Sequence, residues 1–589
     1  MPHKPVGSRA SSPGIVVVIV VLSGSALGQT PGEVSPFRKL TWQEMVEQSA
    51  AMPAATGIRF APDHPRAADR LIQGAVTPVP PATEAVPQSR ALCPGFAALP
   101  YHGVNFQGLD DDNTASPPDT MGAVGPRHVV TMLNTQVRIQ NRIGTLTYAT
   151  VALSAFWGGL SSPFDPRVYY DNLSGRWIAV CAGSSKSANS NWAVSISETT
   201  DPTGSWTSYT MDADAANTLW ADFPCVGFND KWVAVTFNMF AVPGVIPAPT
   251  PGAKMVVLNK PDLLAGGTVA TFTFNTGFDG ANGNALQPAV CLDGDLPDLY
   301  ILNSGYVGNP SNNTNLLRLS RVSGTAGAPV WAPLSGSNYT TPGLFAVQNR
   351  FSSTLVGGTQ ANSATPLDAG DSRMCNVVQR NGSIWAVHTG GWPADTPDRN
   401  AIFWYQLLPS LPSPIGQSGV IQSGGPGGGY MFPSIAVNCG NDACIGFSSV
   451  SPAIYASACY VTRLAGDSAG VTSSTIYVRD GRAKYVKLDP TGVDTRDRWG
   501  DYSATMVDPL DDKTFWTLQE YAELPALGSD RFAVQWAQIT HDCQTPGITA
   551  QPASHTACPG QPVTFSIGVN DVSVVEYQWT RICQMMSIV

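Results

Sequence analysis

The stretch Val168–Val180, VYYDNLSGRWIAV, contains two apolar runs separated by a short polar segment. Asp171 and Gly175 lie in the polar segment, and Trp177 stands near the start of the second run. Asp favours turns because its side chain hydrogen-bonds to the backbone two residues further on, and Gly adopts positive φ without steric cost. The stretch therefore predicts a β-hairpin.

The same pattern recurs along the chain as a β run, a polar turn and a second β run that often begins with Trp. We count seven copies, which begin at Gly122 (GAVGPRHVVTML), Arg167 (RVYYDNLSGRWIAV), Cys225 (CVGFNDKWVAVTF), Ala289 (AVCLDGDLPDLYIL), Asn376 (NVVQRNGSIWAV), Ser434 (SIAVNCGNDACIGF) and Ser503 (SATMVDPLDDKTFWTL). Further β runs between the copies give each unit room for about four strands, which is typical of a β-propeller.

We therefore predict an all-β fold, a β-propeller of about seven blades. The unequal spacing of the hairpins is also compatible with six or eight blades. A pair of β-sandwiches is the alternative, but it predicts turns about every 8–12 residues and no single recurring hairpin.

Composition favours an extracellular protein rich in β-structure. Charged residues make up 13% of the chain, against about 25% in an average domain. Gly (57), Pro (48) and Trp (15) are abundant. The net charge of −10 argues against binding nucleic acid or an anionic membrane through charge.

The first part of the chain, residues 1–28, has the pattern of a secretory signal, with Lys4 and Arg9 before the apolar IVVVIVVL. We expect cleavage, a secreted or cell-surface monomer, and no membrane span afterwards. Residues 29–92 read as an arm or linker with one short helix at TWQEMVEQSAA, where Thr41 and Glu44 are spaced as a capping box. The propeller is expected over 93–543.

The odd count of 11 cysteines leaves at least one unpaired. Cys439 and Cys444 flank GNDA and could form a bridge across a hairpin, or they could be two small buried apolar residues. A bridge between Cys93 and Cys543 could tie together the two ends of the β-rich region.

Residues 544–589 form a different module. QP at 551, CPGQPVTF at 558–565 and YQW at 577–579 resemble the start of a bacterial immunoglobulin-like domain, with Trp579 as its core Trp. Such domains have about 100 residues, and the tail RICQMMSIV does not continue the pattern. We therefore expect a truncated Ig-like domain.

Four segments resemble large secreted bacterial propeller proteins, many of which are loosely described as sialidase-like. They are PPDTMGAVGP (117–126), FDPRVYYDNLSGRW (164–177), DPTGSW (201–206) and RWGDYSATMVDPLDDKTFW (498–516). The likeness covers roughly residues 108–542 and implies a propeller with no particular reaction.

The segment TTDPTGSWT is also similar to the Asp-box turn of sialidases, with Asp201, Gly204 and Trp206 in the family's Asp, Gly and Trp positions. It departs in spacing and has Thr where the family has a leading Ser. In the family this turn lies outside the active site, so the match implies a structural role.

A propeller brings the starts of its innermost strands together around one axis, where ligands commonly bind. The polar residues just before the hairpins are Asp119, Asp165, Arg167, Asp222, Asp371, Arg373, Asp497, Arg498, Asp501 and Tyr502. Arginines from different blades could bind a carboxylate through paired N–H donors.

Resemblance to sialidases implies one use of this set. Arg167, Arg373 and Arg498 would hold a carboxylate, Tyr502 would be the nucleophile, and Asp165 or Asp222 would move the proton.

The Arg-Ile-Pro motif of sialidases is missing, and Asp–Arg pairs at strand starts are commonly ion pairs or turn caps. Our first hypothesis is thus a non-catalytic module that binds glycan or protein, and the second is a sialidase-like glycoside hydrolase.

No cofactor is expected, apart from one candidate cation site. The loop GLDDDNTASPPD supplies Asp110, Asp112 and Asp119, the oxygen ligands that Ca²⁺ prefers, although it lacks EF-hand spacing. The segment GDSAG at 466–470 matches G-x-S-x-G but lies between β runs, so it is not a nucleophile elbow.

Overall fold

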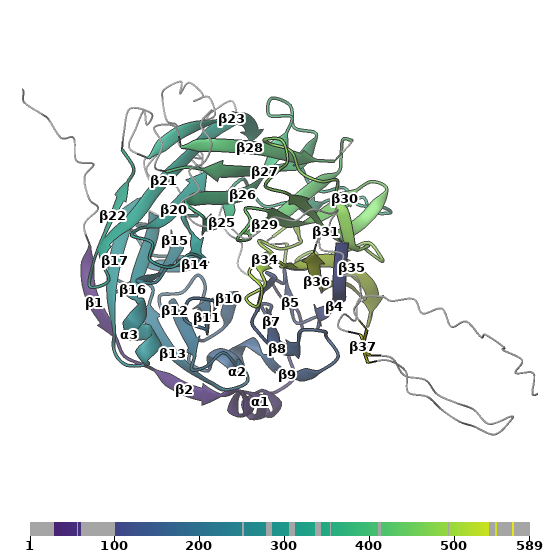
Figure 1. Cartoon of the computed structure of the whole chain (residues 1–589). Helices are drawn as coiled ribbons and strands as arrows, with labels where there is room; N and C mark the ends of the chain where they lie inside the picture. Colours follow the sequence, from purple (N-terminus) through teal and green to yellow (C-terminus); the bar gives the residue numbers. More distant parts are fainter. Residues whose placement is uncertain are drawn as a thin grey trace, which may run out of the picture.

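The computed structural model describes residues 29–55, 57–60, 101–249, 252–277, 285–304, 313–335, 343–353, 355–409, 414–423, 425–492, 494–540, 548–550 and 568–569. Strands dominate, and Figure 1 shows them as twisted sheets arranged around a common axis.

Three of the sheets are separate. The first contains β6 (Met121–Val124), β7 (His128–Met132), β8 (Gln136–Asn141) and β9 (Thr147–Ala152). The second contains β10 (Pro163–Asp171), β11 (Arg176–Gly183), β12 (Asn191–Ser197), β13 (Ser205–Asp212) and β2 (Arg38–Thr41). The third contains β34 (Ala504–Val507), β35 (Phe515–Ala526), β36 (Ser529–Thr540) and β4 (Tyr101–Asp110).

The remaining large sheet is continuous and has 19 strands. It begins with β14 (Leu219–Phe228), β15 (Trp232–Ala241), β16 (Gly252–Asn259), β17 (Val269–Gly277) and β1 (Thr30–Val34). It continues through β18 (Gln287–Pro288), β19 (Val290–Cys291), β20 (Leu299–Ser304), β21 (Asn313–Thr325), β22 (Ala328–Pro333) and β23 (Leu344–Ser352). It ends with β25 (Met374–Arg380), β26 (Ser383–Trp392), β27 (Arg399–Leu407), β28 (Ile415–Gln422), β29 (Gly429–Val437), β30 (Ala443–Ser451), β31 (Ile454–Arg463) and β32 (Ile476–Arg479).

Short elements complete the fold. They are β3 (Arg59–Phe60), which pairs with β5 (Ala115–Ser116), β24 (Leu367–Asp368), which pairs with β33 (Asp497–Arg498), and β37 (Ile548–Ala550), which pairs with β38 (Gly568–Val569). The helices are α1 (Trp42–Ala51), α2 (Leu153–Trp157) and α3 (Lys260–Ala265). The sequence pattern did not predict α2 or α3.

Six of the seven segments quoted as hairpins contain an antiparallel strand pair. In the segment that begins at Ala289, the last strand β20 pairs instead with β18 (Gln287–Pro288), which lies just before the segment. Side chains at the turns explain why the chain reverses there. Asp171 Oδ1 accepts a hydrogen bond from the Leu173 amide at 3.2 Å, and Asn229 Oδ1 accepts from the Lys231 amide at 2.9 Å. These contacts are the Asx turns that the residue types favour.

The innermost strands begin with a second recurring device, which the sequence analysis missed. Asp165, Phe223 and Phe432 have positive φ angles of 55°, 52° and 51°, and each precedes a proline. The strand register shifts at each of these positions. The bulges turn neighbouring side chains, including Arg167, toward the axis.

The innermost strands also touch one another. Phe228 of β14 pairs in parallel with Val290 of β19, which pairs in parallel with Val378 of β25. Parallel contacts between strand ends of successive antiparallel sheets place those sheets around one axis. Together with the arrangement in Figure 1, they define a β-propeller.

The last sheet is completed from the other end of the chain. Strand β4 pairs with β36, for example Phe106 with Trp536 and Asn105 with Ala537. This pairing joins the start of the ring to its end and covers the edge of β36, so that β4 is the outermost strand of this sheet.

Apolar side chains fill the space between neighbouring sheets. Trp177 of β11 and Trp536 of β36 are fully buried in one cluster with residues of β6. Glycine allows the close approach, because a Cβ atom at Gly125 would lie 2.4 Å from Cζ2 of Trp177. The sheets therefore pack face to face around the axis.

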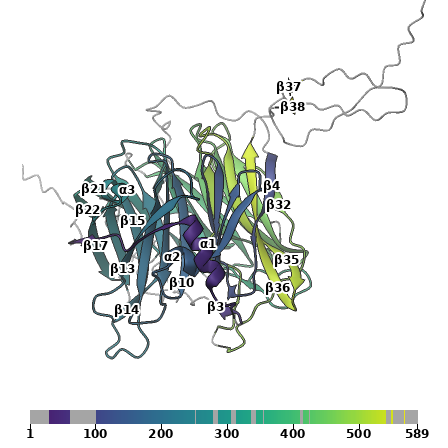
Figure 2. The ribbon, with the colours of Figure 1, turned by 90° about the horizontal axis from the view of Figure 1, so that it is seen from below.

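The N-terminal segment runs along the outside of the ring (Figure 2). Strand β1 pairs with β17, β2 pairs with β13, and α1 packs against α2 and β9. The predicted capping box of α1 is present, since the Glu44 amide donates to Thr41 Oγ1 at 3.2 Å and the Thr41 amide donates to Glu44 Oε2 at 2.7 Å. The segment thus covers two strand edges that would otherwise face solvent.

Of the two alternatives for Cys439 and Cys444, the bridge between them is excluded, and the small buried apolar role holds for Cys444 alone. Cys439 is disulfide-bonded, but Cys444 is a free, buried thiol on β30, so the two do not bridge. Cys444 faces the apolar cluster that contains Tyr460 and Phe515, which is the role of a small buried apolar residue.

Several predictions lie outside the described residues. These are the signal over residues 1–28, the Cys93–Cys543 bridge, most of the linker and, apart from β37 and β38, the truncated Ig-like domain over 544–589.

Candidate functional site

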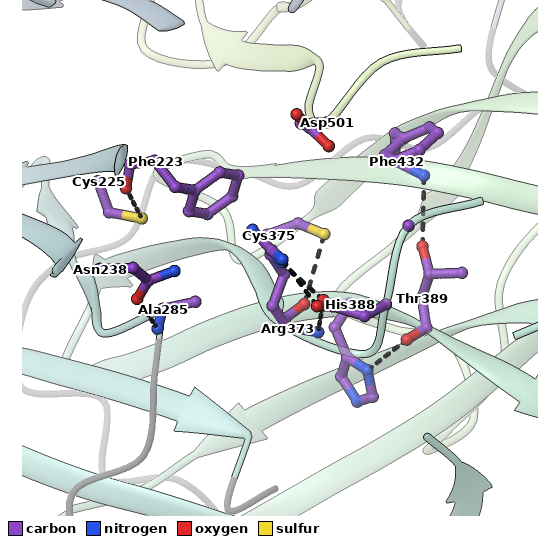
Figure 3. A network of polar contacts seen from close by, with 12 residues as sticks. Phe223, Cys225, Asn238, Ala285, Arg373, Cys375, His388, Thr389, Phe432 and Asp501 are labelled. Carbon is purple, nitrogen blue, oxygen red and sulfur yellow. Dashed lines mark hydrogen bonds and ion pairs between the residues drawn. The ribbon is translucent and has the colours of Figure 1, made fainter. Parts of the chain in front are cut away.

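The candidate site lies at the end of the axis where the innermost strands begin. The structure brings three of the predicted residues, Arg167, Arg373 and Tyr502, together there around the rings of Tyr502 and Phe223. The Arg167 guanidinium lies 3.3 Å from the ring centre of Tyr502 and 5.2 Å from that of Phe223. Arg373 lies 4.4 Å from the Phe223 ring, and Figure 3 shows Arg373, Phe223 and Asp501 in this region.

Arg373 is held by a carboxylate from its own loop. Its Nε and Nη2 donate to the two oxygens of Asp371 at 2.6 Å and 2.7 Å. Burial lowers the pKa of Arg373, but the charge of Asp371 outweighs it, so the pKa is raised above its usual value. The guanidinium is therefore charged, and two of its donors are already used.

Arg498 is also engaged. Its Nη2 donates to Asp501 Oδ2 at 2.7 Å, and both side chains are nearly buried. Burial lowers the pKa of Arg498, whereas Asp501 and then Asp119 raise it, with a net rise. Arg373 and Arg498 thus each form an ion pair with an aspartate two or three residues away in the chain.

Tyr502 is buried, with 2% of its surface exposed, and its hydroxyl donates to the Pro166 carbonyl at 3.2 Å. Burial raises the pKa of Tyr502 well above 10. A tyrosine nucleophile has to lose its proton in the reaction, and this environment favours the neutral phenol.

The two predicted proton carriers are buried in the same region. The Asp165 amide donates to Asn134 Oδ1 at 2.8 Å, which fixes the backbone where φ is positive. Asp222 is fully buried. Burial lowers the pKa of Arg373 and Asp371 raises it, and Asp222 adds a smaller upward contribution. Both carboxylates therefore lie among the arginines.

Two acidic residues of the region have shifted pKa values. Burial raises the pKa of Asp497 to about 7. Burial, followed by repulsion from Asp119, raises the pKa of Glu520 well above 4.5. Glu520 was missed because it lies within β35, where its position in the sequence looks like that of any strand residue.

Two long loops hold the site from the outside. Strands β24 and β33 pair in parallel, and Arg496 forms an ion pair with Asp368 at 2.9 Å. Gln360 and Tyr485 exchange two hydrogen bonds, at 2.6 Å and 2.8 Å. These contacts fix the segments that carry Arg373 and Arg498.

The structure does not gather the three candidate Ca²⁺ ligands. Asp110 pairs with Arg531, Asp112 Oδ1 accepts from the Thr114 amide at 3.0 Å, and Asp119 Oδ2 accepts from Asn134. Within the described ranges, no three His, Cys, Asp or Glu side chains form a group that could hold a metal ion.

The Asp-box-like turn lies between β12 and β13, away from the strand starts. Asp201 Oδ1 accepts from the Thr203 amide at 2.9 Å, and buried Trp206 donates to the Pro202 carbonyl at 2.9 Å. The turn also accepts the first amide of α1, because Trp42 N donates to the Gly204 carbonyl. Its contacts are those of a structural turn.

Comparison with known proteins adds little to this picture. No protein-family model matches the chain, and no curated protein matches it. A Trypanosoma rangeli sialidase in complex with the inhibitor DANA is 10% identical with a TM-score of 0.29, over 63% of this chain and 54% of the sialidase. Extracellular domains 1–2 of Drosophila Semaphorin 1b are 8% identical with a TM-score of 0.31, over 74% and 86% of the two chains.

The WD40 domain of SCAP from fission yeast is 9% identical with a TM-score of 0.29, over 76% of this chain and 92% of that domain. The chain spans about half the length of the sialidase structures it matches. Because TM-scores in this range decide nothing, the propeller architecture rests on the strand pairing described above. Among the described helices, none has the length and apolarity to cross a membrane.

Proposed function

We propose that the chain is an exported β-propeller of about seven blades that binds a glycan or an extracellular protein and does not itself catalyse a reaction. One observation carries the proposal: Arg373 and Arg498 are paired with carboxylates from their own loops. A catalytic arginine cluster would need its donors free for the substrate's carboxylate.

The count of about seven blades is supported by the run of antiparallel units β6–β9, β10–β13, β14–β17, β18–β22, β25–β28, β29–β32 and β34–β36 with β4. Each unit contributes its first strand or strand pair to the axis.

For the binding surface we propose the loops at the end where the innermost strands begin. There Asn362 Nδ2 donates to the Tyr455 hydroxyl at 2.8 Å, and both side chains are partly exposed. An aromatic ring beside an amide suits a sugar, because the ring packs on C–H groups and the amide bonds to hydroxyls.

A glycan array tests this surface. Tyr455→Ala should weaken binding of the retained glycan at least tenfold. Tyr148→Ala is the matched control, because Tyr148 is 43% exposed on β9 and away from these loops, and it should bind as the wild type does. Equal glycan binding by both variants would refute the proposal that the loops around Tyr455 form the binding surface.

A sialidase-like glycoside hydrolase is the second candidate, and the convergence of Arg167, Arg373, Phe223 and Tyr502 favours it. A screen with chromogenic glycosides separates the two. We expect no cleavage above background; cleavage that Arg373→Ala abolishes would establish the hydrolase and overturn the binding proposal.

A further inference from the structure

The axis contains a partly open cavity of about 60 Å³ just inside the candidate site. Strands β6, β10, β19, β25, β29 and β34 all contribute to its wall. A space of this size holds about four water molecules, or one small ion with fewer waters. It is separate from the exposed loops of the proposed binding surface.

The wall carries one charged side chain. Among the described residues that line the cavity, this is Arg167, and none is acidic. Three other titratable groups in the wall stay neutral, because burial raises the pKa of Tyr169 to about 12, that of Cys375 to about 12, and that of Tyr170 above its usual value.

Unlike Arg373 and Arg498, Arg167 forms no ion pair with a carboxylate among the described residues, although Asp165 lies close enough to act on its charge. Its Nε donates to the Pro224 carbonyl at 2.8 Å, and its guanidinium stacks on Tyr502. Its Nη2 is buried and has no hydrogen-bond partner among the described residues, and no described carboxylate forms an ion pair with it. A buried charged donor without a partner is costly, and an anion would satisfy it.

The hydroxyl groups in the wall are hydrogen-bonded among themselves. Gln519 Nε2 donates to Ser434 Oγ at 3.2 Å, and Ser503 Oγ donates to the Phe432 carbonyl at 2.8 Å. The Ser434 hydroxyl lies 2.7 Å from that of Thr505. Because each hydroxyl has a single hydrogen, these contacts leave Arg167 as the charged side chain in the wall with a donor to offer.

We propose that the axial cavity binds one small monovalent inorganic anion of the chloride class, held by the Arg167 guanidinium. A volume of about 60 Å³ matches one small ion better than a sugar or an organic carboxylate with a chain. The site is therefore distinct from any glycan subsite on the loops.

Bromide is the probe, because it replaces chloride and scatters anomalously. Crystals of the full chain grown in sodium bromide should show an anomalous peak inside the cavity beside the Arg167 guanidinium. A cavity that contains only water-like density, with bromide confined to the outer surface, would overturn the proposal.

A solution experiment tests the same site without a crystal. At fixed ionic strength, chloride at about ten times its Kd should raise Tm by about 1–2 °C over gluconate, which is too large to enter. The shift should be lost in Arg167→Met and retained in Arg373→Met, a buried arginine that already has a carboxylate.

Arg167→Lys covers the case in which the methionine variant does not fold, since it keeps the charge and should keep a weaker chloride shift. Equal melting in chloride and gluconate by the wild type, or an undiminished shift in Arg167→Met, would refute the site.

Discussion

Replacing Gly125 by alanine tests whether neighbouring sheets meet at the positions that the structure shows. Gly125 follows β6, whereas Trp177 belongs to β11 in the next sheet. A Cβ atom at 125 would lie 2.4 Å, 3.1 Å and 3.2 Å from Cζ2, Cη2 and Cε2 of the Trp177 ring. Ordinary carbon contacts lie at about 3.5–4.0 Å, so the indole or the backbone would have to move.

The expected cost is that of an overpacked core, about 1–3 kcal/mol in the free energy of unfolding. The indole has little room to move, because it is fully buried and its Nε1 donates to the Thr200 carbonyl at 2.9 Å. In a Trp177→Phe background the clashing ring atoms are gone, so Gly125→Ala should then cost about zero. The two substitutions should therefore couple by about 1–3 kcal/mol.

Urea unfolding followed by circular dichroism at 25 °C measures all four proteins of the cycle. Gly466→Ala is the control, because a Cβ atom there meets nothing within 4 Å, and its effect should stay within about 0.5 kcal/mol. If Gly125→Ala cost the same with Trp177 and with Phe at that position, the added methyl group would be meeting something else. The packing of the two sheets described above would then be wrong.

Three further predictions follow from other parts of the chain. Alkylation of the unfolded, unreduced protein should label Cys444 and not Cys439; a labelled Cys439 would contradict its disulfide. Because burial raises the pKa of Asp497 to about 7, its ionisation opposes folding increasingly as the pH rises from about 4 to about 7. Asp497→Asn should thus raise Tm relative to the wild type at about pH 8 and not at about pH 4, and equal differences at both would refute this. Trp42→Ala removes a buried ring of α1, so amide hydrogen exchange in β2 should accelerate while exchange in β11 stays slow. Unchanged exchange in β2 would show that α1 does not hold the N-terminal segment on the ring.

The hairpins could be predicted because their information is local. Asp171 bonds to an amide two residues away and Trp177 begins the next strand, so a short stretch of sequence is enough. The pairing of β4 with β36 joins residues more than four hundred positions apart, and nothing in either strand identifies the other. The same holds for β1 and β2, because their pairing with β17 and β13 depends on the path of the N-terminal segment around the ring.

The site residues could be predicted as a group, because the propeller places strand starts together. Their partners could not be, since the sequence shows Arg373 near Asp371 without showing whether the pair is closed. The lack of an ion pair at Arg167 among the described residues is likewise a property of the assembled axis. A residue within a strand, such as Glu520, can be assigned to the site only once the structure shows which residues of other segments, such as Asp119, lie beside it.

The pairing of β4 with β36 affects the order in which the chain can finish folding. Strand β4 is made early, but its only partner in the third sheet is the last strand of the propeller to be synthesised. During synthesis β4 therefore cannot form its native strand pairing until β36 (Ser529–Thr540) has been made. Until then, β4 is the strand most exposed to premature pairing with another copy of the chain, and a chaperone that covered β4 would prevent that pairing.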